Sequence, residues 1–154
     1  MFFGAHVSIA GGLPQAPLNA KKIGCEVFQM FTRSPQGGWV PPCDKKVATE
    51  FKANCQTAGQ KEWYVHTPYF INFASANNRI EYGSIKVVRE ELERASLIGA
   101  KYLMTHLGSY KDLGEKEGFK QLVGALDKTL AGYKGETQFL IEMSAGSGAI
   151  IGDT

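Results

Sequence analysis

The chain has 154 residues, of which 44% are hydrophobic and 21% charged, and its formal net charge is +2. This length and composition fit one globular domain over residues 1–154 and exclude a disordered or fibrous protein. So small a net charge does not by itself indicate a nucleic-acid partner.

No apolar stretch approaches the roughly 20 residues that cross a bilayer, and no basic leader precedes an apolar run at the start. We therefore expect no membrane partner. The chain has three cysteines, Cys25, Cys43 and Cys55, and they form no C-x-x-C pair. We expect them to be small packing residues in a reducing, cytoplasmic environment rather than disulfides or zinc ligands.

The N-terminal part of the chain alternates short apolar runs with a segment of helical spacing. Residues 2–7 and 27–31 are expected to be strands, because strand-favouring residues form uninterrupted runs there. Between them, residues 14–23 predict a helix. This helix must begin near Pro14 or be irregular, because Pro17 would break a helix interior.

The middle of the chain continues this alternation. A helical face that Asp44 can cap comprises Val47, Phe51 and Cys55. A third strand is expected over residues 63–66. The next helical face, which ends before Gly99, comprises Ile85, Val88, Leu92 and Ala95.

Strands over residues 102–106 and 139–142 flank the clearest amphipathic helix. Its predicted apolar face comprises Phe119, Leu122, Val123, Leu126 and Leu130. Alternating strands and helices with short connections imply a parallel sheet with right-handed crossovers. The predicted fold class is therefore α/β, with about five parallel strands and four helices.

Polar side chains end three successive strands of this predicted sheet: His66, His106 and Glu142. Because the carboxyl ends of parallel strands meet at one rim, we expect these side chains to converge. Two imidazoles and a carboxylate, with a position left for water, are the ligands of a catalytic zinc ion. His6 would lie at the same rim as a partner of these ligands. A histidine taken alone is more often a hydrogen-bonded rim or core residue, so it is the succession of three strand ends that favours a metal site.

Competing motifs are weaker. The segment 146–152 has one residue too many for a dinucleotide-binding fingerprint, which predicts a turn. Three serines follow strands, but none lies in a G-x-S-x-G elbow, and Ser109 and Ser144 are interpreted as loop caps. The loop after the second strand combines Arg33, Gln36 and Trp39, which suits stacking on a base. An ordinary loop pinned by a partly buried Trp39 explains this composition equally well.

Five motifs in chain order resemble the endonuclease IV family of apurinic/apyrimidinic endonucleases. They are GAHVS at residues 4–8, FTRSP at 31–35 with Trp39, HTPYFIN at 66–72, HLGS at 106–109 and IEMSAG at 141–146. The resemblance implies a (β/α)8 barrel of the TIM type that repairs double-stranded DNA by cleaving the backbone on the 5′ side of abasic sites, using three zinc ions.

The resemblance also assigns roles to individual residues. His66, His106 and Glu142 match metal ligands, and Glu142 is expected to act in catalysis and to bridge to a second metal. Tyr69 matches a residue of a DNA-contacting loop, and residues 33–39 match the DNA-penetrating loop. Here the sequence departs from the family, because Gln36-Gly37-Gly38 stands where an arginine and a glutamine are usual.

A complete barrel takes about 250 residues, so we expect this chain to be the N-terminal part of one, with at most a partial zinc cluster and little activity alone. Open sheet edges would then favour self-association. Two alternatives stay open. One is a sugar isomerase or epimerase of the xylose-isomerase-like barrels, and the other is a non-catalytic fragment that binds metal or DNA.

Overall fold

The computed structural model describes residues 1–146 and 148–152 and contains one parallel sheet in the order β1-β2-β3-β4-β5. Its strands are β1 (Gly4–His6), β2 (Val27–Met30), β3 (Glu62–His66), β4 (Tyr102–Thr105) and β5 (Gln138–Ile141). The strand order follows the chain order, so each crossover leads to the neighbouring strand, as in a (β/α) barrel. The predicted α/β fold is confirmed.

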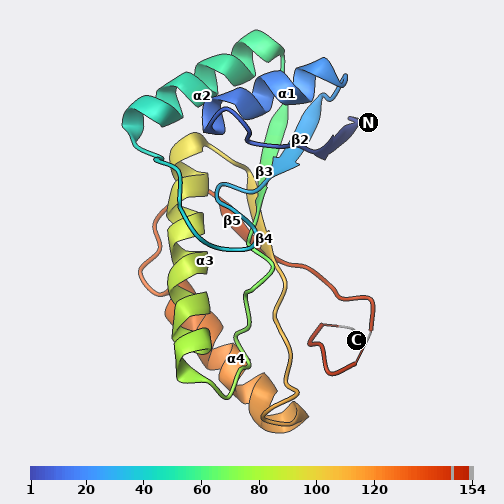
Figure 1. The fold of residues 1–154 in the computed structure, drawn as a ribbon, viewed down its shortest axis with the longest axis vertical. Coiled ribbons are helices and arrows are strands. Elements are labelled where there is room, and N and C mark those ends of the chain that lie inside the picture. The colour runs from blue at the N-terminus through green and yellow to red at the C-terminus, as the bar shows by residue number, and fades with distance from the viewer. Residues whose placement is uncertain (147, 153–154) are drawn as a thin grey trace.

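A 3-10 turn and four helices connect the strands: η1 (Leu13–Gln15), α1 (Ala16–Lys22), α2 (Lys45–Ala58), α3 (Asn78–Ile98) and α4 (Glu115–Leu130). Figure 1 shows α1 and α2 at one end of this arrangement and α3 and α4 at the other. In the part of the chain that the structure describes, no helix is long and apolar enough to cross a membrane.

The helix ends follow the capping rules that the sequence suggested. The Asp44 carboxylate accepts a hydrogen bond from the backbone N–H of Val47 at 2.9 Å, which satisfies a free donor in the first turn of α2. Gly99 ends α3 with φ of 74°, a left-handed conformation that favours glycine. Pro17 lies in the first turn of α1, where its missing N–H costs little.

The core lies between the sheet and the helices. Phe28, Val65 and Leu103 are almost fully buried on the helix side of three neighbouring strands. From the helices, Phe51 packs its ring edge-on against Trp63 with centroids 5.8 Å apart. Burial of these side chains fixes which face of each strand is turned away from the helices, since successive residues alternate between faces.

The face turned away from the helices carries polar groups. The rings of Tyr64 and Tyr102 stack with centroids 5.9 Å apart, and the Tyr64 hydroxyl donates to Glu62 at 2.7 Å. Lys101 donates to the same carboxylate at 2.6 Å. This hydrogen bond and the one from Tyr64 lower the pKa of Glu62.

The buried face of α4 differs from the predicted one. Leu122 is buried as expected, but Phe119, Val123 and Leu130 are 59%, 45% and 39% exposed. The helix instead turns Gly118, Leu122, Ala125 and Thr129 inward. At Gly118 a Cβ would meet that of Tyr110 at 2.4 Å, so a close approach at this glycine sets the rotation of the helix.

The bounds of several strands also differ from the predicted ones. Phe2 and Phe3 were expected to belong to the first strand, but it begins at Gly4 and both phenylalanines are exposed. Strands β4 and β5 end at Thr105 and Ile141, so His106 and Glu142 directly follow their strands instead of ending them.

Candidate metal centre

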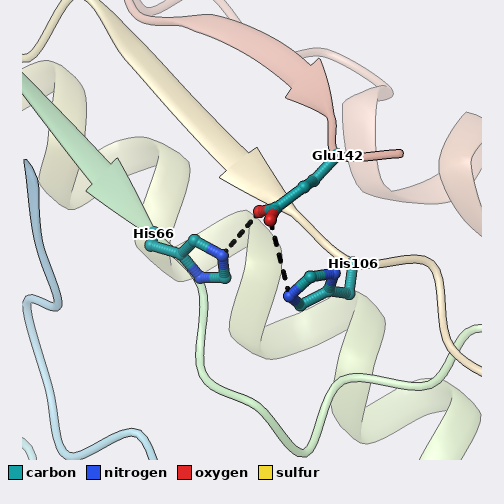
Figure 2. A group of neighbouring side chains, drawn as sticks. All are labelled: His66, His106 and Glu142. Atoms are coloured by element: carbon teal, nitrogen blue, oxygen red, sulfur yellow. Dashed lines mark hydrogen bonds and ion pairs between the residues drawn. The ribbon is translucent and has the colours of Figure 1, made fainter. Parts of the chain in front are cut away.

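Three side chains from consecutive strand ends converge in the structure, as Figure 2 shows. His66, His106 and Glu142 each offer a ligand atom, and these atoms all lie within 4.8 Å of one another. Nε2 of His66 lies 2.7 Å from Oε2 of Glu142, and Nε2 of His106 lies 3.9 Å from Oε1. Ligands of one tetrahedral zinc ion, with bonds of about 2 Å, lie roughly 3.3 Å apart. The two distances, one to each oxygen of Glu142, lie on either side of that separation, so small side-chain adjustments would let these residues hold a zinc ion.

Hydrogen bonds between strand ends fix the His66 ring and the backbone at His106. Nδ1 of His66 lies 2.6 Å from the carbonyl oxygen of Thr67. If Nδ1 donates there, Nε2 carries the lone pair that a cation would bind. The Thr67 hydroxyl bonds that of Thr105 at 2.7 Å, and Thr105 in turn donates to the carbonyl of His106 at 2.9 Å. Both threonines are fully buried, which makes this link between β3 and β4 rigid.

The backbone ladder continues past the last strand and orients the carboxylate. The backbone N–H of Glu142 donates to the carbonyl of Thr105 at 3.0 Å, although β5 has already ended. The Glu142 side chain is 40% exposed and that of His106 is 41% exposed, whereas that of His66 is 8% exposed. The centre is therefore anchored on its His66 side and open to solvent on the other.

Aromatic rings connect His6 to this centre. The Phe31 ring lies 4.4 Å from the His6 ring and 5.5 Å from the His66 ring, measured between centroids. His6 itself bonds Gln29 at 2.8 Å and is not part of the ligand group. The predicted position of His6 at this rim agrees with the cavity that it lines, whereas no role at the site was predicted for Phe31 or Gln29. The alternation of faces could have identified both, because Gln29 lies in β2 and Phe31, two positions later, directly follows that strand.

Three cavities adjoin one another across the strand ends. The one over the centre has a volume of about 490 Å³ and is lined by all three ligand residues, His6 and Tyr69. A second, of about 720 Å³, shares His6 and Phe31 with it and extends to Trp39. A third, of about 610 Å³, shares Tyr69, His106 and Glu142 and extends to Ser144. Together they form a groove that passes over the candidate centre.

Of the predicted DNA-contacting residues, three are exposed to solvent and one is buried. Tyr69 and Trp39 are 65% and 76% exposed beside this groove, and Gln36 is exposed. The exposure of Trp39 corrects the alternative in which a partly buried Trp39 pins its loop.

Arg33 departs from the expectation of a DNA contact. It is buried, and its Nε donates to the buried carboxylate of Glu91 at 2.6 Å. Burial alone would lower the pKa of the Arg33 guanidinium, but Glu91 and Glu90 more than offset this and raise it. The guanidinium is thus paired through Nε with Glu91 and through Nη2 with Glu90, so its main contacts are with α3, although Arg33 also lines the second cavity.

Within the described residues, the competing motifs do not build a second site. The Ser109 hydroxyl donates to the carbonyl of Ala149 at 2.8 Å, and the Ser144 hydroxyl accepts from the backbone of Gly146 at 3.4 Å. Both are thus loop caps, as predicted. Ser147, within the predicted turn 146–152, lies outside the described residues. Cys55 is buried, which raises its thiol pKa to about 12, so it is inert as a ligand at neutral pH.

Comparison with known proteins agrees with this architecture. The model of the "Xylose isomerase-like TIM barrel" family matches residues 17–154. The chain is 37% identical over 154 residues to "Probable endonuclease 4" of Cenarchaeum symbiosum, covering 99% of this chain and 55% of that protein. The corresponding protein of Methanocorpusculum labreanum is 37% identical over 152 residues, covering 98% and 54%. This chain thus spans about half the length of the curated relatives that it matches.

Solved structures extend the comparison. The crystal structure of endonuclease IV from Thermus thermophilus superposes with a TM-score of 0.84 at 28% identity, covering 99% of this chain and 55% of that one. A D-tagatose 3-epimerase-like protein superposes with a TM-score of 0.68 at 15% identity, covering 97% and 56%, which shows a shared fold alone. The resemblance to endonuclease IV expected from the sequence is confirmed.

Proposed function

We propose, on the premise that this chain belongs to the xylose isomerase-like TIM barrel family, that it is the N-terminal part of a zinc-dependent DNA repair endonuclease. The proposed reaction is hydrolysis of the phosphodiester bond on the 5′ side of an abasic site in double-stranded DNA, and the proposed compartment is the cytoplasm. The observation that carries the proposal is the convergence of His66, His106 and Glu142 from three successive strands. The two archaeal relatives named probable endonuclease 4 support it.

The residues of the chain would divide the work as follows. His66 and His106 would bind the cation through Nε2, and the buried threonine link would keep their rings in register. Glu142 would complete the ligand set, and it presents a different oxygen to each imidazole. Zinc, when bound, supplies a water whose pKa is lowered to about 7 and neutralises charge on the phosphate.

A duplex would lie along the groove over the centre. Tyr69 and Trp39 expose their rings on that side of the molecule, where they can stack on bases or on the sugar of an unstacked nucleotide. Of the residues that the structure describes, a single group of three can hold a cation. The chain would therefore hold at most part of a three-zinc cluster, and we expect little endonuclease activity from it alone, since the electrostatic clamp on the phosphate would be incomplete.

Metal analysis of ligand variants tests this proposal. We expect the 154-residue chain to retain zinc after gel filtration and expect His66→Ala, His106→Ala and Glu142→Ala to lose it. His6→Ala is the matched control, because His6 lies at the same rim outside the ligand group. Unchanged zinc content in all three ligand variants would remove the site.

The second candidate function is sugar isomerisation or epimerisation. The observation that favours it is the fold shared with the D-tagatose 3-epimerase-like protein. A full-length barrel that contains this chain as its N-terminal part can be assayed with an abasic duplex and, separately, with ketoses. Each assay is run with and without a chelator. Backbone nicking that the chelator abolishes supports the endonuclease. Ketose turnover without nicking rejects it, and zinc binding without either reaction indicates a non-catalytic fragment.

A further inference from the structure

A buried cluster of charges joins the middle of α3 to the segment that follows β2. Glu91 of α3 is fully buried, and Thr32 and Arg33 of the segment are buried beside it. A carboxylate is seldom enclosed in this way unless both of its oxygens have partners. Here the hydrogen-bond partners of both oxygens come from the segment after β2, and Arg94 of α3 adds a longer ion pair to Oε1 at 3.5 Å.

The hydrogen bonds of this cluster are short and mutually dependent. Oε1 of Glu91 accepts from Nε of Arg33 at 2.6 Å, and Oε2 accepts from the Thr32 hydroxyl at 2.6 Å. Arg94, one turn further along α3, donates to that hydroxyl at 2.8 Å and to the carbonyl of Thr32 at 2.7 Å. The exposed carboxylate of Glu90 adds a second contact to Arg33 at 3.0 Å. Two arginines thus face two glutamates, and the cluster is balanced in charge.

The residues on both sides of Thr32 reach the candidate centre. Phe31 precedes it and packs against the rings of His6 and Tyr69, with centroids 4.4 and 5.2 Å away. Pro35 follows it and accepts a hydrogen bond from the backbone N–H of Tyr69 at 3.2 Å. A displacement of Thr32 would therefore move an aromatic wall of the groove and the loop that carries Trp39.

We propose that Glu91 is a positioning residue: through Thr32 and Arg33 it sets where Phe31 and the loop 32–39 lie relative to the metal-binding triad, and thereby the shape of the DNA-binding groove. The inference rests on the proposed function for the role of the groove, but the positioning itself does not depend on it. It also gives Arg33 a role, since its charge serves the cluster and not the ligand.

The competing explanation is that this cluster only adds stability. The direction of the contacts argues against it, because Glu91 joins α3 to a loop after a distant strand. Its neighbour Glu93 shows the ordinary alternative, an exposed carboxylate paired with Arg89 of the same helix at 2.9 Å. Loss of Glu93 would leave the loop 32–39 untouched.

Two pairs of matched variants separate the explanations. Glu91→Gln removes the charge of the cluster and Glu93→Gln makes the same change on the exposed face of α3. Thr32→Val removes the bridging hydroxyl at nearly constant volume, whereas Thr32→Ser keeps it. Thr32→Val leaves all four charges in place, so it tests the proposal even where Glu91→Gln fails to fold.

The first measurement is nuclear Overhauser contacts between aromatic rings in the 154-residue chain. We expect Glu91→Gln and Thr32→Val to lose the Phe31 contacts with His6 and Tyr69 while keeping the contact between Phe51 and Trp63. Glu93→Gln and Thr32→Ser should keep all of them. Phe31 contacts that persist in both test variants, with only the thermal midpoint lowered, would overturn the proposal.

The second measurement is binding of a labelled duplex that carries one tetrahydrofuran residue as the abasic analogue, at equal zinc content. We expect the two test variants to bind it roughly tenfold more weakly than the controls. Lost ring contacts without weaker binding, in a chain whose unmodified form binds the duplex, would also overturn the proposal. A wild-type chain that does not bind the duplex would reject the proposed function, and the ring contacts would still decide the positioning.

Discussion

Nε2 of His66 lies 2.7 Å from Oε2 of Glu142, although the two residues are 76 positions apart in the chain. So short a contact needs a proton between the nitrogen and the oxygen, and a cation bound to both atoms would take the place of that proton. A hydrogen bond between two of the proposed ligands thus holds their side chains together.

This relationship predicts the effect of removing the charge of Glu142 alone. Glu142→Gln keeps the size of the side chain but replaces an anionic ligand with a neutral amide. We expect zinc affinity, measured by competition with a chromophoric chelator, to fall at least about tenfold, the lower limit seen when even an outer partner of a metal ligand is lost. Glu136→Gln, at an exposed position, should bind zinc like the unmodified chain. Equal affinities of the two variants would contradict the assignment.

The face of the sheet that is turned away from the helices predicts a late titration of Tyr64. Burial and the hydrogen bond to Glu62 raise the pKa of Tyr64 to about 12, above the value of about 10 in an unfolded chain. Folding therefore favours the protonated phenol, so this contribution to stability is complete below about pH 10 and is lost as the pH rises towards 12. Ultraviolet absorbance should show one of the six tyrosines ionising late, and Tyr64→Phe should remove that component. A single transition near pH 10 for all of them would disprove this.

Two phenylalanines test where the core ends. Phe51 is fully buried against Phe28 and Trp63, so Phe51→Ala should lower the free energy of unfolding by about 3–5 kcal/mol. Phe119 is 59% exposed, and Phe119→Ala should change it by no more than about 0.5 kcal/mol. Urea unfolding at matched protein concentration measures both, and a large loss for Phe119→Ala would mean that another surface covers α4.

Gly108, in the loop after β4, should tolerate no side chain. It has φ of 98°, and a Cβ there would lie 2.2 Å from Oδ1 of Asn72, an atom that also accepts from the backbone of Ser109 at 3.1 Å. We expect Gly108→Ala to destabilise the chain by about 2–4 kcal/mol. At Gly59, φ is 74° and no atom lies within 4 Å of a Cβ, so Gly59→Ala should cost only about 1 kcal/mol. Chemical denaturation that ranks the two variants equally would refute the steric argument.

The edges of the sheet predict association. Strands β1 and β5 are its two edges, and Leu140, Ile141 and Met143 are 40%, 49% and 61% exposed around the second. We expect the chain to bind an apolar dye and to sediment as more than a monomer, and expect Leu140→Lys to reduce both effects. A monomer without dye binding would show that these edges are harmless.

How far the sequence could predict this structure depends on the range of the interactions. The positions of His66, His106 and Glu142 follow from the apolar runs that precede them, because parallel strands bring their carboxyl ends to one rim. The start of α2 at Asp44 likewise depends on a local hydrogen bond. Such features need only nearby residues, so the sequence pattern was sufficient for them.

Other features depend on distant partners that no local pattern reveals. Arg33 has the composition of a surface loop cation, and only the position of Glu91, 58 residues away, explains its burial. The rotation of α4 is decided by the approach of Tyr110 to Gly118. The predicted apolar face of α4 is wider than the surface that the helix buries, so the sequence could not show which side of that face would be covered. The exposure of Trp39 likewise depends on which distant residues lie beside its loop, and the sequence alone does not show them.

The succession of the proposed ligands at the ends of β3, β4 and β5 has a consequence for the stability of the sheet. Because β5 pairs only with β4 in the described chain, its detachment would carry Glu142 away from both imidazoles. A bound cation would therefore link β5 to β3 and β4. Its binding free energy would add to the free energy that keeps β5 paired with the sheet. Amide protons of β5 should exchange with solvent more slowly in the presence of zinc, so their exchange rate would report on metal binding at this end of the sheet.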